Sequence, residues 1–449
     1  MSPAARIIPL TTTACEAWLA SRTESTRNWA RASGFQGQAG TSLAVPDDAG
    51  HITQVLCGLG RRPSLFGLAP LAGLGLDVPL MLTDEDWADP GTARMALGYR
   101  LATYRFDRYR DQGQATELLW PDTPAAAELD AIARATFRVR DLVNTPAEDM
   151  GPEQLADAAR SLAEAHDADF ETIVGDQLLE QNFPAIHAVG RAATRAPRLI
   201  DLLWGDPDDP KLTLVGMGVC FDSGGLDITP SAGMRLMKKD MGGAAHVIAL
   251  AGLIMERQLP VRLRMLVPAV ENAIAGNAYR PGDIVSTRSG QTIEIGNTDA
   301  EGRVILSDAL TLACEEKPDL LIDYATLTGA ARVALGPDLP PIFTDDESLS
   351  SAWFEASRSV EDPLWRLPLY NGYDEMIDPK IADVSNTGSM PMAGAITAGL
   401  FLRRFVAPET PWTHLDVYAW NPVDRPGRPR GGEAHALRAC WELLRRRFR

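Results

Sequence analysis

The sequence has few of the features that mark secreted or membrane-spanning proteins. Its five cysteines, Cys15, Cys57, Cys220, Cys314 and Cys440, are odd in number, scattered and never arranged as CxxC, which disfavours both a disulfide framework and a zinc knuckle. No stretch approaches the roughly 18 uninterrupted apolar residues of a spanning helix, and no basic segment followed by an apolar one opens the chain. We therefore expect buried thiols, no membrane partner and a cytoplasmic location.

Basic residues are also in deficit. The chain has 43 Lys and Arg against 60 Asp and Glu, which gives a formal net charge of -17. A protein that binds nucleic acid normally presents a basic face to the phosphates, so no nucleic-acid partner is expected. The chain has 449 residues and is 45% apolar, which is enough to bury more than one core and predicts two or more domains.

Apolar patterns divide the chain into a small N-terminal part and a larger C-terminal part. Residues 1–124 contain short apolar runs, such as 42–45 and 52–59, separated by Gly and Pro, and this pattern predicts a small α/β domain. In residues 125–145 the apolar positions recur about every 3.6 residues until Asn144-Thr145-Pro146 stops them. The sequence therefore predicts a helix that links the two domains.

Residues 146–449 alternate between continuous apolar runs and helical patterns. Buried strands are predicted at 199–204, 212–219, 261–270, 320–326 and 415–420. Helices are predicted near 152–166, 241–257, 303–315, 347–358, 394–406 and 432–447. This alternation indicates an α/β fold with a mainly parallel sheet covered by helices, in which ligands bind at the carboxyl ends of the strands.

Four acidic residues follow these strands within glycine-rich segments. Asp222 belongs to FDSGG, Asp240 to KKDMGG, and Asp299 and Glu301 to NTDAEGR. If the last segment is extended, Asp299 and Glu301 point the same way, because side chains alternate along a strand. Asp240 would lie at the start of a helix, where the dipole favours an anion, and Gly302 would allow a sharp turn.

Each acid alone has an ordinary structural explanation, because Asp before Gly-Gly is usually a turn residue and Asp at a helix start is usually a cap. Four ionised carboxylates in one place, however, repel one another unless a cation neutralises them. Oxygen ligands suit Mn²⁺, Mg²⁺ or Zn²⁺, and bridging carboxylates would hold two ions about 3.5–4 Å apart. Arg303 beside them would hold an anion, orient a reacting carbonyl, or merely balance the acids.

The segment Asn297–Arg303, NTDAEGR, resembles the signature of the leucyl (cytosol) aminopeptidases. The resemblance extends over most of residues 140–420, whereas the N-terminal domain matches only in position and size. Its further motifs are DLVNTPAEDMGP at 141–152, FDSGG at 221–225, DMGGAA at 240–245, YRPGD at 279–283, ATLTGA at 325–330 and ADVSN at 382–386.

The resemblance implies an enzyme that uses two divalent metal ions to release the N-terminal residue of short peptides. By motif, Asp222 and Glu301 would bridge the ions, and Asp240 would join the first site and hold the free amine of the substrate. Asp299 would serve the second site, and Arg303 would retain the bicarbonate that the family uses as general base.

The resemblance also implies a pocket for the first side chain of the peptide and a particular assembly. Met237, Thr326 and Gly329 match positions that line this pocket, although core packing explains Met237 equally well. The family forms homohexamers whose active sites face an internal cavity, which would admit short peptides and exclude folded proteins.

Two positions depart from the family pattern. Where the family has a lysine ligand to one metal, this chain has Met217, whose thioether is a poor donor for Mn²⁺ or Mg²⁺. Where a second lysine donates to the developing gem-diolate, this chain has Thr229. Losing one such donor typically costs about 10²–10³ in kcat. Lys238 and Lys239 flank the predicted helix start, and the sequence does not show that either reaches a vacant position.

Two main hypotheses follow from these observations. The first is a metal-dependent aminopeptidase of short peptides whose activity is weakened or shifted in metal preference by Met217 and Thr229. The second is a pseudopeptidase that keeps the fold, the assembly and metal or peptide binding. A different two-metal hydrolase, such as an amidase of small amino-acid derivatives, is a third, and the acidic charge disfavours the DNA binding that some relatives have.

Overall fold

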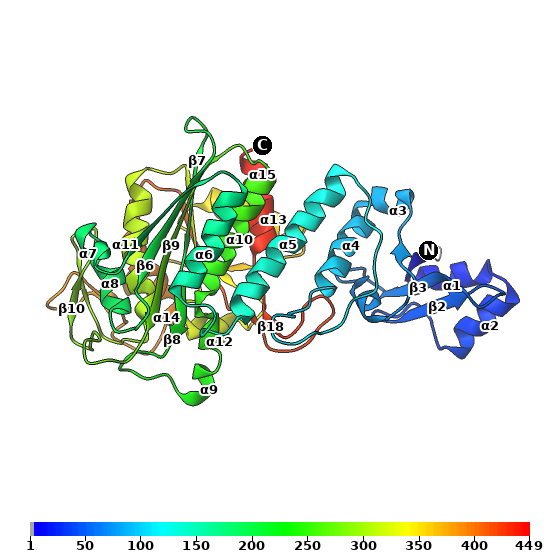
Figure 1. Ribbon diagram of the computed structural model, residues 1–449, viewed down its shortest axis with the longest axis horizontal. Helices are drawn as coiled ribbons and strands as arrows, with labels where there is room; N and C mark the ends of the chain where they lie inside the picture. The colour runs from blue at the N-terminus through cyan, green and yellow to red at the C-terminus, as the bar shows by residue number, and fades with distance from the viewer. Residues whose placement is uncertain (1–3) are drawn as a thin grey trace. The chain divides into compact units, whose positions relative to one another are not determined.

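The structure is a computed structural model that describes residues 4–449. Contacts between Cα atoms divide the chain into two compact units (Figure 1). The first contains the residues up to Phe137 together with Val423–Arg430, and the second contains Arg138–Pro422 and Gly431–Arg449. Both units mix helices and strands, and the predicted α/β class is confirmed.

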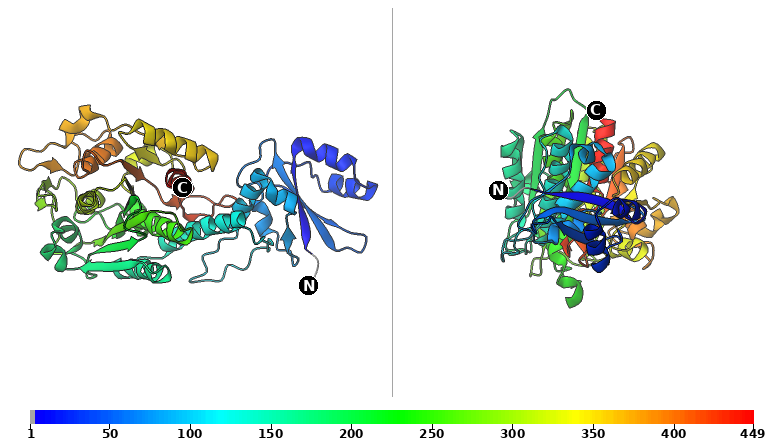
Figure 2. Two further views of the ribbon diagram at one scale, coloured as in Figure 1. Left: turned by 90° about the horizontal axis from the view of Figure 1, so that it is seen from above. Right: turned by 90° about the vertical axis from the view of Figure 1, so that its right-hand side faces the viewer.

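The first unit is built on a four-stranded sheet with the order β2-β3-β1-β4. Its elements are β1 (Ala5–Thr11), α1 (Thr12–Ala20), α2 (Glu24–Ala32), β2 (Ser42–Pro46), β3 (Ile52–Gly60), the 3-10 helix η1 (Ala69–Gly73), β4 (Leu80–Met81), α3 (Asp84–Ala88) and α4 (Pro90–Ala102). Successive residues of a strand face opposite sides, so the sheet carries one apolar cluster with η1 and α4 and another with α1 and α2 (Figure 2).

Helix α5 (Pro124–Asn144) forms where the sequence predicts the linker helix. The division between the two units falls inside this helix, after Phe137. The exact domain limits drawn from the sequence, 1–124, 125–145 and 146–449, stay a prediction. Near the end of α5, in the part of the helix that belongs to the second unit, the buried guanidinium of Arg140 donates to the carboxylate of Glu433 over 3.1 Å.

The second unit is built on a nine-stranded sheet with the order β14-β13-β16-β12-β7-β9-β6-β5, in which β8 also pairs with β9. Its elements are α6 (Pro152–Ala165), β5 (Asp169–Val174), α7 (Gln177–Glu180), α8 (Pro184–Gly190), β6 (Arg198–Trp204), β7 (Lys211–Gly216), β8 (Gly218–Asp222), α9 (Ser231–Met234), the 3-10 helix η2 (Met237–Met241), α10 (Gly242–Glu256), β9 (Arg262–Asn272), β10 (Ile284–Ser286), β11 (Thr292–Glu294), α11 (Glu301–Glu315), β12 (Leu320–Ala325), α12 (Gly329–Leu335), β13 (Pro341–Phe343), α13 (Glu347–Ser359), β14 (Trp365–Arg366), the 3-10 helix η3 (Asn371–Ile377), β15 (Val384–Ser385), α14 (Gly394–Arg403), β16 (Trp412–Asp416), β17 (Trp420–Asn421), β18 (Gly431–Gly432) and α15 (Leu437–Arg447).

The large sheet is mainly parallel, as predicted. Strands β16, β12, β7 and β9 pair in parallel, and antiparallel pairs occur toward the two edges, at β13–β16, β9–β6 and β6–β5. Helices α6 and α10 pack on one face and α8 and α11 on the other (Figure 1). Because both faces are covered, the central strands are mostly buried and largely apolar, although a few polar residues such as Asp323 and His414 are buried among them.

Several elements differ from the sequence-based expectation. The predicted strand 212–219 is broken at Met217 into β7 and β8. A Cβ on Gly216 would approach Val247 to 2.4 Å and one on Gly218 would approach the carbonyl oxygen of Pro268 to 2.7 Å, so both positions require glycine. The predicted helix 432–447 begins only at Leu437, because Gly431–Gly432 forms strand β18 instead.

Candidate metal centre

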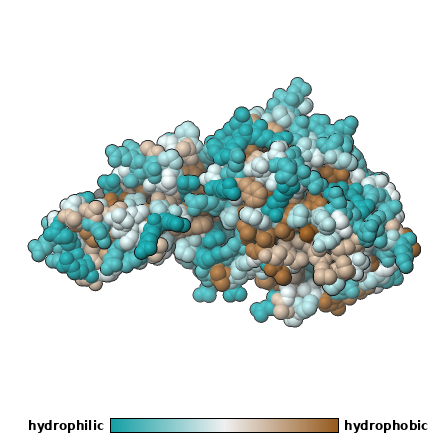
Figure 3. Space-filling view, turned by 180° about the vertical axis from the view of Figure 1, so that it is seen from behind, coloured by the Kyte–Doolittle hydropathy of each residue, from teal (hydrophilic) through white to brown (hydrophobic). Residues whose placement is uncertain are grey.

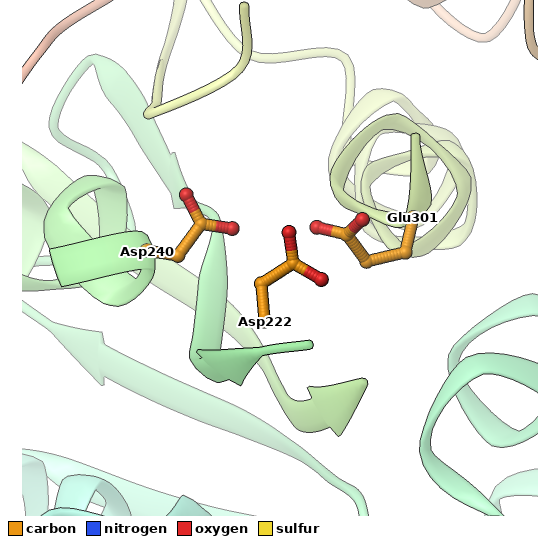
Figure 4. A group of neighbouring side chains, drawn as sticks. All are labelled: Asp222, Asp240 and Glu301. Carbon is orange, nitrogen blue, oxygen red and sulfur yellow. The ribbon is translucent and has the colours of Figure 1, made fainter. Parts of the chain in front are cut away.

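Three of the four predicted acids converge at the carboxyl ends of the central strands. Asp222 is the last residue of β8, Asp240 lies in η2 directly before α10, and Glu301 is the first residue of α11. Ligand oxygens from the three carboxylates lie within 4.8 Å of one another. Figure 4 shows the three side chains pointing toward one another, and each residue is at most 5% exposed.

The local reason for the position of Glu301 differs from the one expected. Residues 299–301 are not extended, so the alternation argument for Asp299 and Glu301 was wrong. Instead a turn leads into α11, and Glu301 occupies the first turn of this helix, where the dipole stabilises an anion. Gly302 is helical and does not serve a sharp turn: a Cβ there would lie 2.5 Å from Sδ of Met217, so the glycine makes room for that side chain.

Asp299 lies at the rim of this cluster. Its carboxylate lines the same cavity as the other three acids, but the residue is more exposed than they are. The hydroxyl of Thr229 donates to Oδ1 of Asp299 over 2.7 Å. The structure therefore brings three acids into direct proximity and places the fourth beside them with one oxygen already hydrogen-bonded.

Burial raises the pKa of all four acids, and repulsion from neighbouring carboxylates adds to the rise at Asp222, Asp299 and Glu301. Burial, followed by the charges of Asp240 and Asp299, raises the pKa of Asp222 well above its usual value. Burial and the neighbouring carboxylates have the same effect on the pKa of Glu301. For Asp240 burial also raises the pKa, and Lys239 opposes the rise. For Asp299 burial raises the pKa and the bond from Thr229 opposes it.

This set of donors is suited to a divalent cation. Three buried carboxylates with raised pKa values favour any partner that supplies positive charge, and oxygen-rich sites prefer Mn²⁺, Mg²⁺ or Zn²⁺. Met217 lines the cavity but contributes only its soft sulfur. The carboxylates therefore match the chemistry of a metal centre, and the position of Met217 is the one poor match.

Lys239 is a feature of the site that the sequence did not locate. Its side chain is 3% exposed, lines the cavity, and holds Nζ 3.6 Å from Oδ1 of Asp240. Lys238 points elsewhere: its Nζ donates to the backbone oxygen of Asn144 over 2.5 Å and lies over the ring of Trp420. Of the two adjacent lysines, only Lys239 brings a positive charge into the acidic cluster.

Arg303 is the third residue of α11, and its side chain lines the same cavity. Its Nη1 donates to the backbone oxygen of Asn386 over 2.8 Å, and its Nε is buried without a hydrogen-bond partner. Burial lowers the pKa of Arg303 to about 10, while Asp416 and Glu301 oppose that shift, so the guanidinium remains charged at neutral pH. A buried cation therefore lines the cavity with one of its nitrogens, Nε, lacking a protein partner.

The residues expected to line a pocket for the first side chain also border this cavity. Met237, Thr326 and Gly329 all line it. Thr326 is buried, and its hydroxyl donates to Oδ1 of Asp240 over 2.9 Å, which fixes the orientation of that carboxylate. Thr229, by contrast, is occupied with Asp299 and does not line the cavity.

An α/β fold with buried carboxylates gathered at the carboxyl ends of a mainly parallel sheet is the architecture of a metal-dependent hydrolase. The relatives identify the group more closely. Residues 137–440 match the catalytic domain of the cytosol aminopeptidase family, and residues 6–121 match the M17 aminopeptidase N-terminal domain. This chain belongs to the cytosol aminopeptidase family, and the predicted leucyl aminopeptidase resemblance is confirmed.

Individual relatives agree with this assignment. A probable cytosol aminopeptidase from Syntrophotalea carbinolica is 42% identical over 421 residues, which is 88% of this chain and 84% of the relative. The crystal structure of cytosol aminopeptidase from Coxiella burnetii superposes with a TM-score of 0.96 at 48% identity, covering 100% of this chain and 98% of that chain. The bottromycin maturation enzyme BotP in complex with Mn has a TM-score of 0.89 at 35% identity, with 99% of both chains covered.

These similarities confirm the interpretation as a hydrolase of the aminopeptidase class. They also agree with the two-part α/β architecture inferred from the sequence. Within residues 4–449, no helix combines the length and the apolar character needed to cross a membrane.

Proposed function

We propose that this chain is a metal-dependent aminopeptidase that releases leucine-like N-terminal residues from short peptides, with turnover weakened at two positions. The observation that carries the proposal is the convergence of Asp222, Asp240 and Glu301 within 4.8 Å inside a cavity that Arg303 also lines. Two divalent ions bound in such a cage supply Lewis acidity toward a peptide carbonyl and lower the pKa of water.

Each acid receives a role that its position allows. Asp222, which lies between Asp240 and Glu301 in Figure 4, and Glu301 would together hold both ions. Asp240 would complete the first site and accept the free amine of the peptide, and the hydroxyl of Thr326 would hold it in place. Asp299, at the rim, would serve the second site.

Arg303 would act on the substrate side of the cage. Its guanidinium is anchored through Nη1 while Nε has no protein partner, so it is suited to retain an anion such as bicarbonate beside the scissile bond. That anion would accept a proton as general base. Met237, Thr326 and Gly329 would contact the first side chain of the peptide.

The proposal includes the resident ions, the assembly and the location. Carboxylate ligands favour Mn²⁺ or Zn²⁺, with Mg²⁺ as a further candidate, and a similar protein was solved in complex with Mn. We expect a homohexamer in the cytoplasm. The apolar surface of the larger unit in Figure 3, and exposed apolar side chains such as Val333, Ile381 and Met392, support burial against further copies of the chain.

The proposed activity is tested with purified protein, Mn²⁺ or Zn²⁺, and leucine p-nitroanilide. We expect slow release of p-nitroaniline that EDTA abolishes and added Mn²⁺ restores, because hydrolysis depends on ions bound by the acids. An anilide blocked by acetylation at its amine should not be cleaved, since Asp240 would then have no free amine to accept. Cleavage of the blocked substrate, or cleavage that survives complete metal removal, would contradict the proposal.

A pseudopeptidase is the second candidate, and the contacts of Thr229 favour it. The hydroxyl at this position is directed at Asp299 instead of the cavity, so Thr229 does not replace the lysine that stabilises the developing oxyanion in the family. Metal bound stoichiometrically without any turnover of peptides or anilides would support this second candidate over the first.

Lys239 provides a further prediction about metal binding. A unit charge 4 Å from another contributes about 4 kcal/mol at an effective dielectric of about 20, whereas a tenfold change in affinity needs only about 1.4 kcal/mol. Removing the ammonium beside Asp240 should therefore strengthen binding, and we expect Lys239→Met to raise the affinity for Mn²⁺ at least about tenfold in calorimetric titrations.

The adjacent lysine is the matched control for this experiment. Lys238→Met removes the same charge from a side chain that points to Asn144, so the affinity for Mn²⁺ should stay close to that of the parent. A fall in affinity in Lys239→Met would show that the amine of Lys239 assists metal binding, contrary to this prediction.

A further inference from the structure

Asn272 lies under the acidic cluster because of strand pairing. It is the last residue of β9, and in the parallel pairing of β8 with β9 it is the register partner of Asp222, the last residue of β8. Residues paired in neighbouring parallel strands direct their side chains to the same side of the sheet. The fold therefore places an amide next to a carboxylate that we propose as a metal ligand.

The amide nitrogen of Asn272 contacts two of the three segments that build the site. Nδ2 donates to Oδ1 of Asp222 over 2.9 Å and to the backbone oxygen of Thr298 over 2.9 Å, and it lies 3.5 Å from Oε2 of Glu301. Asn272 is 1% exposed, so these bonds are shielded from water. One side chain thus connects the end of β8 to the loop that carries Asp299 and Glu301.

The amide oxygen of Asn272 has no partner. Oδ1 is buried without a hydrogen bond and faces Gly225, where a Cβ would lie 2.9 Å from it. The reverse orientation of the amide would turn this oxygen toward the carboxylate of Asp222, and repulsion between the two excludes it. A buried polar atom left unpaired costs free energy. Asn272 carries this cost at Oδ1 in the same orientation that lets Nδ2 donate to Asp222.

We infer that Asn272 is a positioning residue of the metal centre, which orients the carboxylate of Asp222 by donating to Oδ1 and leaves Oδ2 for an ion. The inference rests on the proposed metal-dependent function. Residues that hydrogen-bond to the ligands of a metal commonly influence how tightly the metal binds. Their loss typically lowers metal affinity or activity about 10–100-fold. An amide is also a neutral donor, so it orients Asp222 without adding charge to a cage that already holds several acids.

The test is calorimetric titration of the full-length protein with Mn²⁺. We expect Asn272→Ala to lower the affinity about 10–100-fold. Tyr279→Phe is the matched control, because the hydroxyl of Tyr279 donates to the same backbone oxygen of Thr298 over 2.7 Å and makes no bond to Asp222. Its affinity should remain close to that of the parent.

The outcomes separate this inference from the proposed function. If the parent protein does not bind Mn²⁺, both the proposed function and the inference are wrong. If the parent binds and Asn272→Ala binds equally well, only the inference is overturned. Equal losses in Asn272→Ala and Tyr279→Phe also overturn it, because the effect would then come from anchoring the loop at Thr298. Melting curves of the metal-free variants show whether each one is folded.

Discussion

Replacing Met217 and Thr229 together by lysine should raise kcat toward leucine p-nitroanilide by about 10²–10³, which is the usual effect of one oxyanion donor. Methionine and lysine side chains are of similar length, and Met217 already lines the cavity beside the acids. An amine there adds a nitrogen donor to the cage. A lysine in place of Thr229 gives up the bond to Asp299 and supplies a cationic donor next to it.

The single variants show which position limits the rate. Thr229→Lys alone should account for most of the gain in kcat, whereas Met217→Lys alone should mainly change metal affinity. The control is the pair Met217→Leu and Thr229→Ser, which preserves size and polarity and should leave the rate near that of the parent. If the double lysine variant is no faster than the parent, then Met217 and Thr229 are not the cause of weak turnover. If the variant cleaves and the parent does not, the pseudopeptidase hypothesis is the correct one.

Glu301→Gln should abolish binding of both ions, while Asp299→Ala should remove one. The proposed roles make this distinction, because Glu301 would help to hold both ions of a two-metal site and Asp299 would help to hold only the second. Metal content after purification in Mn²⁺, measured by plasma mass spectrometry, gives the stoichiometry. Hydrolysis should be lost in Glu301→Gln, since no second acid occupies the first turn of α11.

The stability of the metal-free protein provides an independent check on these variants. Because the pKa of Glu301 in the folded protein lies well above its usual value, its ionisation disfavours the fold, and the resulting loss of stability grows as the pH rises. A neutral glutamine of the same size should therefore raise the melting temperature of the metal-free protein at neutral pH.

Asp176→Ala, which changes a side chain that is 93% exposed, should alter neither metal content nor melting. Unchanged metal content in Asp299→Ala would exclude Asp299 from the ligand set.

Much of the architecture follows from local patterns in the sequence. The helical periodicity of residues 125–145 predicted α5 to within one residue at each end, because a long amphipathic helix depends mainly on neighbours along the chain. The apolar runs predicted most of the central strands for the same reason, although the predicted strand 415–420 shares only residues 415 and 416 with β16. The motifs around Asp222, Asp240 and Glu301 indicated the family. The break at Met217 was missed, since close packing of Gly216 and Gly218 against other segments is not visible in a hydrophobic pattern.

The site depended on information that is not local. Asp299 and Glu301 were expected to share a side through an extended backbone, whereas the start of α11 directs Glu301 into the cluster. The sequence does not distinguish the adjacent residues Lys238 and Lys239, yet packing directs Lys238 toward Asn144 and Lys239 toward Asp240. Asn272 carried no motif at all, because its importance comes from the register between β8 and β9.

By itself the sequence determined the α/β class, the family and the acids that approach one another, because periodicity and short motifs are properties of neighbouring residues. Only the tertiary structure decided which charges share the cavity, that Thr229 is bound to Asp299, and that Asn272 supports Asp222. Those contacts join residues 50 to 70 positions apart. They form only when parallel strands align their ends, and no local pattern encodes the register that brings them together.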